Sequence, residues 1–141
     1  MEVYEIASRA RTASRTLATL TRERKDAGLR AMAAALEQSS DQLLSANARD
    51  VEAAVAAGTP DAMIDRLSLN PQRVSGMAQG LRDLAGLTDP VGQVVRGWNL
   101  ANGVHVDQLR VPFGVIGIIY EARPNVTADA AGICLKSGNA S

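Results

Sequence analysis

The spacing of apolar residues changes abruptly at Asp89-Pro90, and this change divides the chain into a helical part and a part with strands. Over residues 3–39 apolar side chains recur every three or four positions without a proline, which predicts two amphipathic helices that break near Thr21. Beyond Pro90 valines replace alanines, and the runs become typical of strands. We therefore expect residues 1–89 to form a helical region and an α/β arrangement to follow it.

Capping signals predict where the next helices begin. Ser39, with Gln42 three residues later, resembles a capping box and predicts the start of a third helix. Thr59 and Asn70 each stand before a proline suited to the first helical position, which predicts a short and then a longer helix. Gly86 follows the last apolar position of the longer helix and predicts its end.

Residues 90–112 are predicted to form a β-hairpin arm. The runs Gln93–Leu100 and Val104–Val111 read as strands, and Asn102-Gly103 between them suits a two-residue type I′ turn. Trp98 on the first strand is interpreted as a packing or interface anchor.

Residues 113–141 read as the start of a parallel-sheet domain. Phe113–Tyr120 is apolar on both faces, as expected of a strand that helices cover, and Val126–Lys136 is predicted to be a helix ended by Gly138. A parallel strand needs a neighbour that the chain reaches through a crossover, and that neighbour falls beyond Ser141. We therefore expect this sequence to be the front of a longer protein.

Composition excludes several function classes. The chain has 141 residues with 15 Lys+Arg against 15 Asp+Glu, so no positive surplus favours nucleic acid. The longest apolar run, Val111–Tyr120, is about half of the ~20 residues of a membrane span, and the first residues do not resemble a secretory signal, which favours the cytoplasm. A single cysteine, Cys134, and a single histidine, His105, predict neither a disulfide nor a metal cluster.

Charges are uneven along the chain despite the neutral total. Residues 1–30 carry seven basic and four acidic side chains, whereas residues 37–89 carry four basic and eight acidic ones. Both sets are interpreted as solvated helix faces.

The loop Glu121–Asn125 holds the residues that most suggest chemistry. Ligands of open α/β sheets bind beyond the carboxyl ends of the strands, which is where this loop lies. Arg123 offers a guanidinium for phosphate or carboxylate, and Asn125 offers an amide donor for an oxyanion at a helix amino terminus. In the alternative interpretation Asn125 only caps the helix, while Arg123 and Glu121 lie in solvent. No G-x-G-x-x-G is present, so cofactor-binding residues are not assigned.

Two other reactive residue types are interpreted as structural. Cys134 falls inside the predicted helix on an apolar side with Ala130 and Ile133, where a thiol is a packing group. His105 lies on a hairpin strand with no acid or thiol partner that the sequence fixes, so we interpret it as a structural or surface residue.

Several segments resemble one enzyme family. The run from Val111 through Tyr120-Glu121-Ala122-Arg123-Pro124-Asn125 to Thr127, continued by Leu135–Ala140, is similar to gamma-glutamyl phosphate reductases, also called glutamate-5-semialdehyde dehydrogenases. Ala46–Asp50, Asp65-Arg66-Leu67 and Asp89–Gly92 resemble the same family, so the resemblance covers essentially the whole chain but only the front of the family. The segment Tyr120–Asn125 disfavours other aldehyde dehydrogenases, which usually have a proline-tryptophan-asparagine loop there.

The resemblance implies a fold and a reaction. The fold is that of the aldehyde dehydrogenase superfamily, here its amino-terminal helices, hairpin and first strand and helix of the cofactor domain. The reaction is the NADPH-dependent reduction of L-glutamate 5-phosphate to L-glutamate 5-semialdehyde in proline biosynthesis, through a cysteine thiolate beyond Ser141 that Cys134 does not match. Asn125 then resembles the superfamily's oxyanion donor, and Arg123 becomes a candidate for a substrate anion.

The resemblance also implies how the protein behaves. The hairpin is expected to help subunits associate into a homo-oligomer, and the 141-residue chain alone is expected to be inactive. The alternative hypothesis is a catalytically inactive helical and hairpin module that acts only through association.

Overall fold

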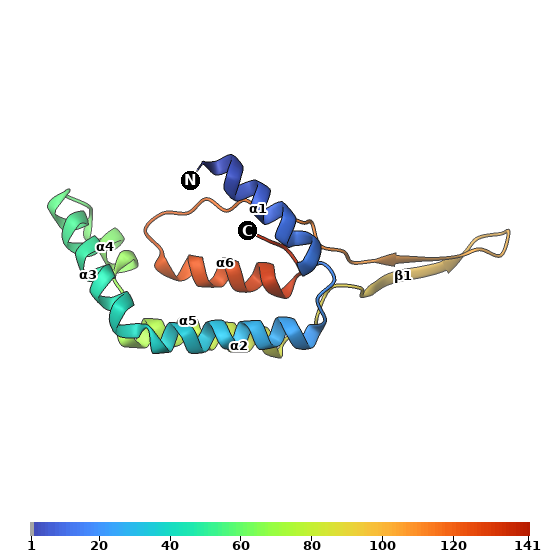
Figure 1. Cartoon of the computed structure of the whole chain (residues 1–141), viewed down its shortest axis with the longest axis horizontal. Helices are drawn as coiled ribbons and strands as arrows, with labels where there is room; N and C mark the ends of the chain where they lie inside the picture. Colours follow the sequence, from blue (N-terminus) through green and yellow to red (C-terminus); the bar gives the residue numbers. More distant parts are fainter. Residues whose placement is uncertain (1) are drawn as a thin grey trace.

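Residues 2–141, which the computed structural model describes, form six α-helices and one antiparallel pair of strands. In chain order these are α1 (Val3–Leu17), α2 (Arg22–Gln38), α3 (Ser40–Ala56), α4 (Asp61–Leu67), α5 (Pro71–Gly86), β1 (Val94–Asn99), β2 (His105–Leu109) and α6 (Pro124–Lys136). In Figure 1, α2 and α5 lie side by side, α6 lies along them, and the hairpin of β1 and β2 projects away from the helices. This order confirms the predicted helical region, hairpin and final helix.

Side-chain caps begin two of the helices. The Thr21 hydroxyl accepts a hydrogen bond from the Arg24 N–H at 3.4 Å, which confirms the predicted break between the first two helices. The Asn70 side chain accepts from the Arg73 N–H at 2.7 Å, and Pro71 occupies the first position of α5 as predicted.

The other two capping predictions are wrong. Ser39 ends α2 and begins α3 at once, and its own N–H already donates to the Ala35 carbonyl at 3.0 Å, so the reciprocal bonds of a capping box do not form. Helix α4 begins one residue later than predicted, with Pro60 rather than Thr59 at the N-cap and no side-chain cap. Neither helix start is held by a side-chain cap.

Small residues let the long helices pack closely. The buried cluster between α2 and α5 consists of Leu29, Ala33, Ala78, Leu81 and Ala85. Helix α6 approaches this cluster at Gly132, where an added Cβ would lie 2.5 Å from the Leu81 Cδ2 atom. Because only a hydrogen occupies that position, α6 packs directly on the α2 and α5 layer.

Two buried lysines join the helices to one another and to the hairpin. Lys136 Nζ, at the end of α6, donates to Asp26 Oδ1 of α2 at 2.6 Å and to the Ala85 carbonyl of α5 at 3.1 Å. Lys25 Nζ, which is fully buried, donates to both carboxylate oxygens of Asp89 at 3.0 and 2.8 Å. The interpretation of the charged residues as solvated faces is therefore wrong for Lys25 and Asp26, since both are buried where α2 faces its partners.

The environment of Asp26 shifts its proton affinity. Burial by itself raises the pKa of Asp26, but the hydrogen bonds and charges of Lys136 and Arg22 outweigh burial and hold the pKa below the usual 3.8. At the surface Arg82 of α5 donates to Glu37 of α2 at 2.8 Å, and this bond lowers the pKa of Glu37.

The hairpin forms with a different turn from the one predicted. The Leu100 N–H donates to the Val104 carbonyl at 2.8 Å, and the Gly103 N–H donates to the Leu100 carbonyl at 2.9 Å, so the three residues 101–103, rather than two, form the loop. A type I′ turn needs positive φ at both central residues, and here only Gly103 has it, at +85°. The Asn102 side chain accepts from the Val104 N–H at 3.2 Å, which stabilises the longer loop.

The apolar run of residues 113–120 is extended, but it is not the predicted buried strand. Its only strand-type pairing among the described residues is one parallel bridge between Val115 and Ala140. The Phe113 and Ile119 side chains are 91% and 102% exposed. A β-ladder needs a neighbouring strand. Within residues 2–141 only Ala140 pairs with this run, through that single bridge.

None of the helices that these residues form has the length and apolar character needed to cross a membrane.

We expect Gly132→Ala to destabilise the protein and Gly76→Ala, on α5, to stabilise it. Both changes gain up to about 1 kcal/mol of helix propensity. At Gly132 the new methyl group meets Leu81 at 2.5 Å and Leu84 at 3.0 Å, and overpacking costs about 1–3 kcal/mol, whereas nothing lies within 4 Å of a Cβ at Gly76. Urea denaturation measures both. A Gly132→Ala protein as stable as Gly76→Ala would contradict the close packing of α6.

Acid should weaken the fold through Asp26. Because its pKa is lower in the folded state, its contribution to the free energy of unfolding is fully present above about pH 4. That contribution is lost as the pH falls through the lowered pKa. The difference in free energy of unfolding between the wild type and Asp26→Asn, measured by urea denaturation, is therefore expected to become smaller as the pH is lowered from 7 to 3. Asp41→Asn, at an exposed carboxylate of α3, controls for the loss of one acidic charge. A gap of equal size at both pH values would contradict the ion pair.

Candidate functional site

The chain turns sharply into α6 through the loop of residues 121–125. Ala122 has a φ of +50°, a left-handed conformation that costs a residue with a Cβ about 1–2 kcal/mol. Arg123 is the N-cap and Pro124 the first residue of α6, so the helix begins two residues before the predicted Val126. The Tyr120 hydroxyl hydrogen-bonds the Thr127 hydroxyl at 2.6 Å across the loop. These features hold the first turn of α6 in a fixed orientation.

Asn125 lies in the first turn of α6 with its side chain exposed. Its amide nitrogen donates to Asp129 Oδ2 one turn later at 3.0 Å. The alternative role of a cap is wrong, because Arg123 occupies the N-cap and makes no side-chain cap bond. An amide nitrogen carries two N–H groups, so Asn125 keeps one donor for a ligand while Asp129 orients the side chain.

Arg123 and Asn125 line a polar cavity of about 500 Å³ between α4, α5 and the start of α6. Arg66 of α4 and Arg73 of α5 line the same cavity from the opposite elements. Glu121 is exposed and does not line it. The structure therefore brings together both predicted site residues and adds two arginines that stand 50 or more positions earlier in the chain.

Arg73 is fixed in place by its neighbours. Its Nη2 atom donates to Asp65 Oδ1 at 2.9 Å, and its Nη1 atom donates to the Ser68 carbonyl at 2.6 Å and to the Asp65 carbonyl. In the sequence, Asp65-Arg66-Leu67 stood out only through the family resemblance. Neither helical spacing nor a local motif indicates that this segment faces Asn125.

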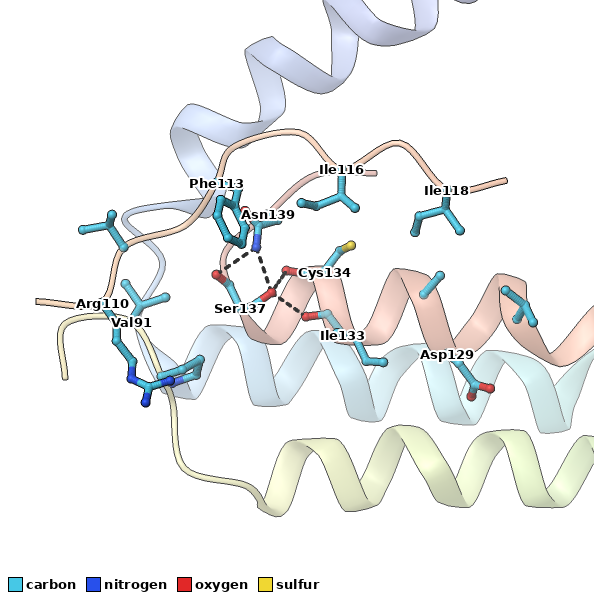
Figure 2. A pocket seen from close by; sticks show the side chains of 14 residues that line it. Val91, Arg110, Phe113, Ile116, Ile118, Asp129, Ile133, Cys134, Ser137 and Asn139 are labelled. Atoms are coloured by element: carbon cyan, nitrogen blue, oxygen red, sulfur yellow. Dashed lines mark hydrogen bonds between the residues drawn. The ribbon is translucent and has the colours of Figure 1, made fainter. Parts of the chain in front are cut away.

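A second, apolar cavity of about 660 Å³ also lies against α6 and shares Asp129 with the polar cavity. Figure 2 shows Phe113, Ile116 and Ile118 of the extended segment above α6, with Cys134 beneath them. Asn139 holds this segment, since its side-chain oxygen accepts from the Gly114 N–H at 2.8 Å. This lining lacks the clustered charges of the polar cavity, although Arg110 and Asp129 reach its edge.

The remaining residues singled out in the sequence lie away from the polar cavity. Cys134 is a buried free thiol in α6, as predicted for a packing residue. His105 lies on the exposed hairpin, but it does have an acid partner, because its Nε2 atom is 3.0 Å from Asp107 Oδ1. Trp98 is 41% exposed and lies under the Arg96 guanidinium at 5.1 Å from the ring centre. Within residues 2–141 no three His, Cys, Asp or Glu side chains gather as metal ligands.

Solved structures connect this arrangement with a known enzyme. A crystal structure of gamma-glutamyl phosphate reductase from Thermotoga maritima matches 99% of this chain with a TM-score of 0.94 and 39% sequence identity. The chain resembles an amino-terminal portion of gamma-glutamyl phosphate reductase. The resemblance inferred from the sequence is thereby confirmed.

A second reductase supports the same conclusion. The gamma-glutamyl phosphate reductase of Saccharomyces cerevisiae matches 96% of this chain with a TM-score of 0.90 and 34% identity. The chain spans 34% of the length of each of these two reductase structures. No protein-family model matches the chain.

Proposed function

We propose that this chain is the amino-terminal portion of a cytoplasmic, NADPH-dependent reductase that converts L-glutamate 5-phosphate to L-glutamate 5-semialdehyde in proline biosynthesis. The observation that carries the proposal is the match to the Thermotoga maritima gamma-glutamyl phosphate reductase, at 39% identity over 99% of the chain. The TM-score of 0.94 for the same match supports a shared fold.

The proposed chemistry needs a donor of the kind that Asn125 offers. A cysteine thiolate supplied by protein outside residues 2–141 attacks the acyl carbon, phosphate leaves, and the thioester accepts a hydride to give the aldehyde and the free thiolate. Negative charge develops on the carbonyl oxygen in both steps. Asn125, oriented by Asp129 and exposed at a helix amino terminus, is proposed to donate a hydrogen bond to that oxygen.

Arg123 is proposed to bind an anionic group of the substrate. Its guanidinium lines the same cavity as Asn125 and makes no hydrogen bond to residues 2–141. A planar guanidinium binds phosphate or carboxylate with two parallel hydrogen bonds.

These residues lack the glycine-rich pattern that marks a dinucleotide site. NADPH, the proposed cofactor, supplies the hydride. Dinucleotides bind in the crevice beyond adjacent parallel strands, and residues 113–120 have a single parallel bridge followed by a loop without glycine. We therefore assign no residue of this chain to NADPH.

The hairpin is proposed to join subunits into a homo-oligomer. Both of its strands expose apolar side chains, among them Val94, Leu109 and Trp98 at 58%, 50% and 41%. A two-stranded hairpin that projects from a domain with such a surface gains stability by pairing with another surface.

In the full-length protein that carries residues 1–141, Asn125→Ala should lower kcat about 100-fold or more with little change in KM. The reason is that an oxyanion donor acts on charge that develops in the transition state. The assay follows NADP⁺ reduction with glutamate 5-semialdehyde and phosphate. Gln42→Ala, at an exposed amide of α3, is the control and should leave kcat unchanged. Unchanged turnover in a folded Asn125→Ala protein would remove Asn125 from the mechanism.

The same assay tests the function itself. Wild-type full-length protein should reduce NADP⁺ only when both semialdehyde and phosphate are present, whereas residues 1–141 on their own should be inactive. Folded full-length protein without this activity would contradict the reductase proposal. Association through the hairpin would then be the remaining hypothesis.

A further inference from the structure

The polar cavity holds more positive charge than its own residues neutralise. Three arginines and two aspartates line it, together with Asn125 at the start of α6. The Asp65 carboxylate forms an ion pair with Arg73 at 2.9 Å, and the Asp129 carboxylate accepts a hydrogen bond from the Asn125 amide at 3.0 Å. The guanidinium groups of Arg66 and Arg123 make no hydrogen bond or ion pair within residues 2–141. These two guanidinium groups therefore line one cavity from different elements, α4 and the N-cap of α6.

The two walls differ in how firmly they are held. Arg73 is fixed by three hydrogen bonds to Asp65 and Ser68, and it ties the end of α4 to the start of α5. This brace positions Arg66, the residue after Asp65 on the same helix. Arg66 and Arg123 are both exposed, so each long side chain can swing onto a ligand from a fixed backbone.

The cavity also has room and a favourable field. Gly76 lies in its wall, and no atom lies within 4 Å of the position that a Cβ would take there. At the amino terminus of α6, a helix of 13 residues that lines the same cavity, Pro124 has no N–H and the Val126 N–H donates to the Arg123 carbonyl at 3.0 Å, so the Asn125 N–H is the first backbone donor left for a ligand. A small anion placed there would meet two guanidiniums and the Asn125 N–H, and the three arginines against the carboxylates of Asp65 and Asp129 leave the cavity one net positive charge.

We propose that Arg66, together with Arg123 and the amino terminus of α6, forms a subsite for a phosphate or carboxylate oxyanion. The identity of the ligand rests on the proposed function, because the substrate of that reaction carries an acyl phosphate and an α-carboxylate. The shared chemistry is an oxyanion held by two guanidiniums, and Arg73 is a positioning residue that does not bind the anion.

Kinetics in the full-length protein separate the sources of the anion. Arg66→Gln should raise the KM for phosphate or for glutamate 5-semialdehyde about tenfold or more, because a hydrogen bond to a charged group is lost, with kcat within about twofold. Arg66→Lys keeps the charge and should restore part of the affinity. Arg30→Gln, at an exposed arginine of α2, should change neither constant. A change in the KM for NADP⁺ alone, or a fall in kcat with unchanged KM, would overturn the subsite.

A binding measurement tests the subsite without turnover. In nuclear magnetic resonance spectra of residues 1–141, inorganic phosphate at constant ionic strength should shift the amide signals of Gly76 and Asn125. Arg66→Gln and Arg123→Gln should each weaken the shifts, and Arg30→Gln should not. Phosphate shifts in a protein whose full-length form is inactive would support the anion subsite and refute the reductase. The absence of shifts at both amides in the folded wild type would overturn the subsite, even if the full-length protein is an active reductase.

Discussion

The buried bond between Lys136 and Asp26 sets the position of the helix on which the candidate site depends. Lys136 ends α6, and its ammonium group binds both the Asp26 carboxylate of α2 and the Ala85 carbonyl of α5. Burying such charges is costly unless their geometry is well matched, so α6 has few alternative positions against its neighbours. Asn125 and Arg123 lie at the opposite end of this helix, about 20 Å away by the rise of a helix of its length.

A second buried lysine performs the same task for the hairpin. Lys25, beside Asp26 in α2, binds Asp89, whose carboxylate also accepts from the Val91 N–H at 3.0 Å. Adjacent residues of one helix thus fix both the last helix and the segment that leads into β1. The layer of α2 and α5 therefore positions both α6 and the hairpin, each through one buried ion pair.

The two cavities that α6 lines have different chemical character. The polar cavity at its start gathers arginines and an amide, which suits the recognition of anions. The cavity beneath residues 113–118 is mainly apolar, and Ile133 and Phe113 near it remain 55% and 91% exposed. Large exposed apolar surfaces of this kind mark places where another protein surface packs.

The sequence by itself determined what depends on neighbouring residues. The helix start at Asn70-Pro71, the break at Thr21 and the end at Gly138, whose φ is +75°, follow from bonds that span only a few positions. The loop with Arg123 and Asn125 was also found, because a polar segment between an apolar run and a helix is a local pattern. Only the tertiary structure decided that Lys25 and Asp26 are buried, that residues 113–120 lack a ladder partner, and that Arg66 faces Asn125. These outcomes depend on which faces of distant segments meet. The local spacing of residues predicts that a helix has an apolar face, but it does not predict which distant segment packs against that face.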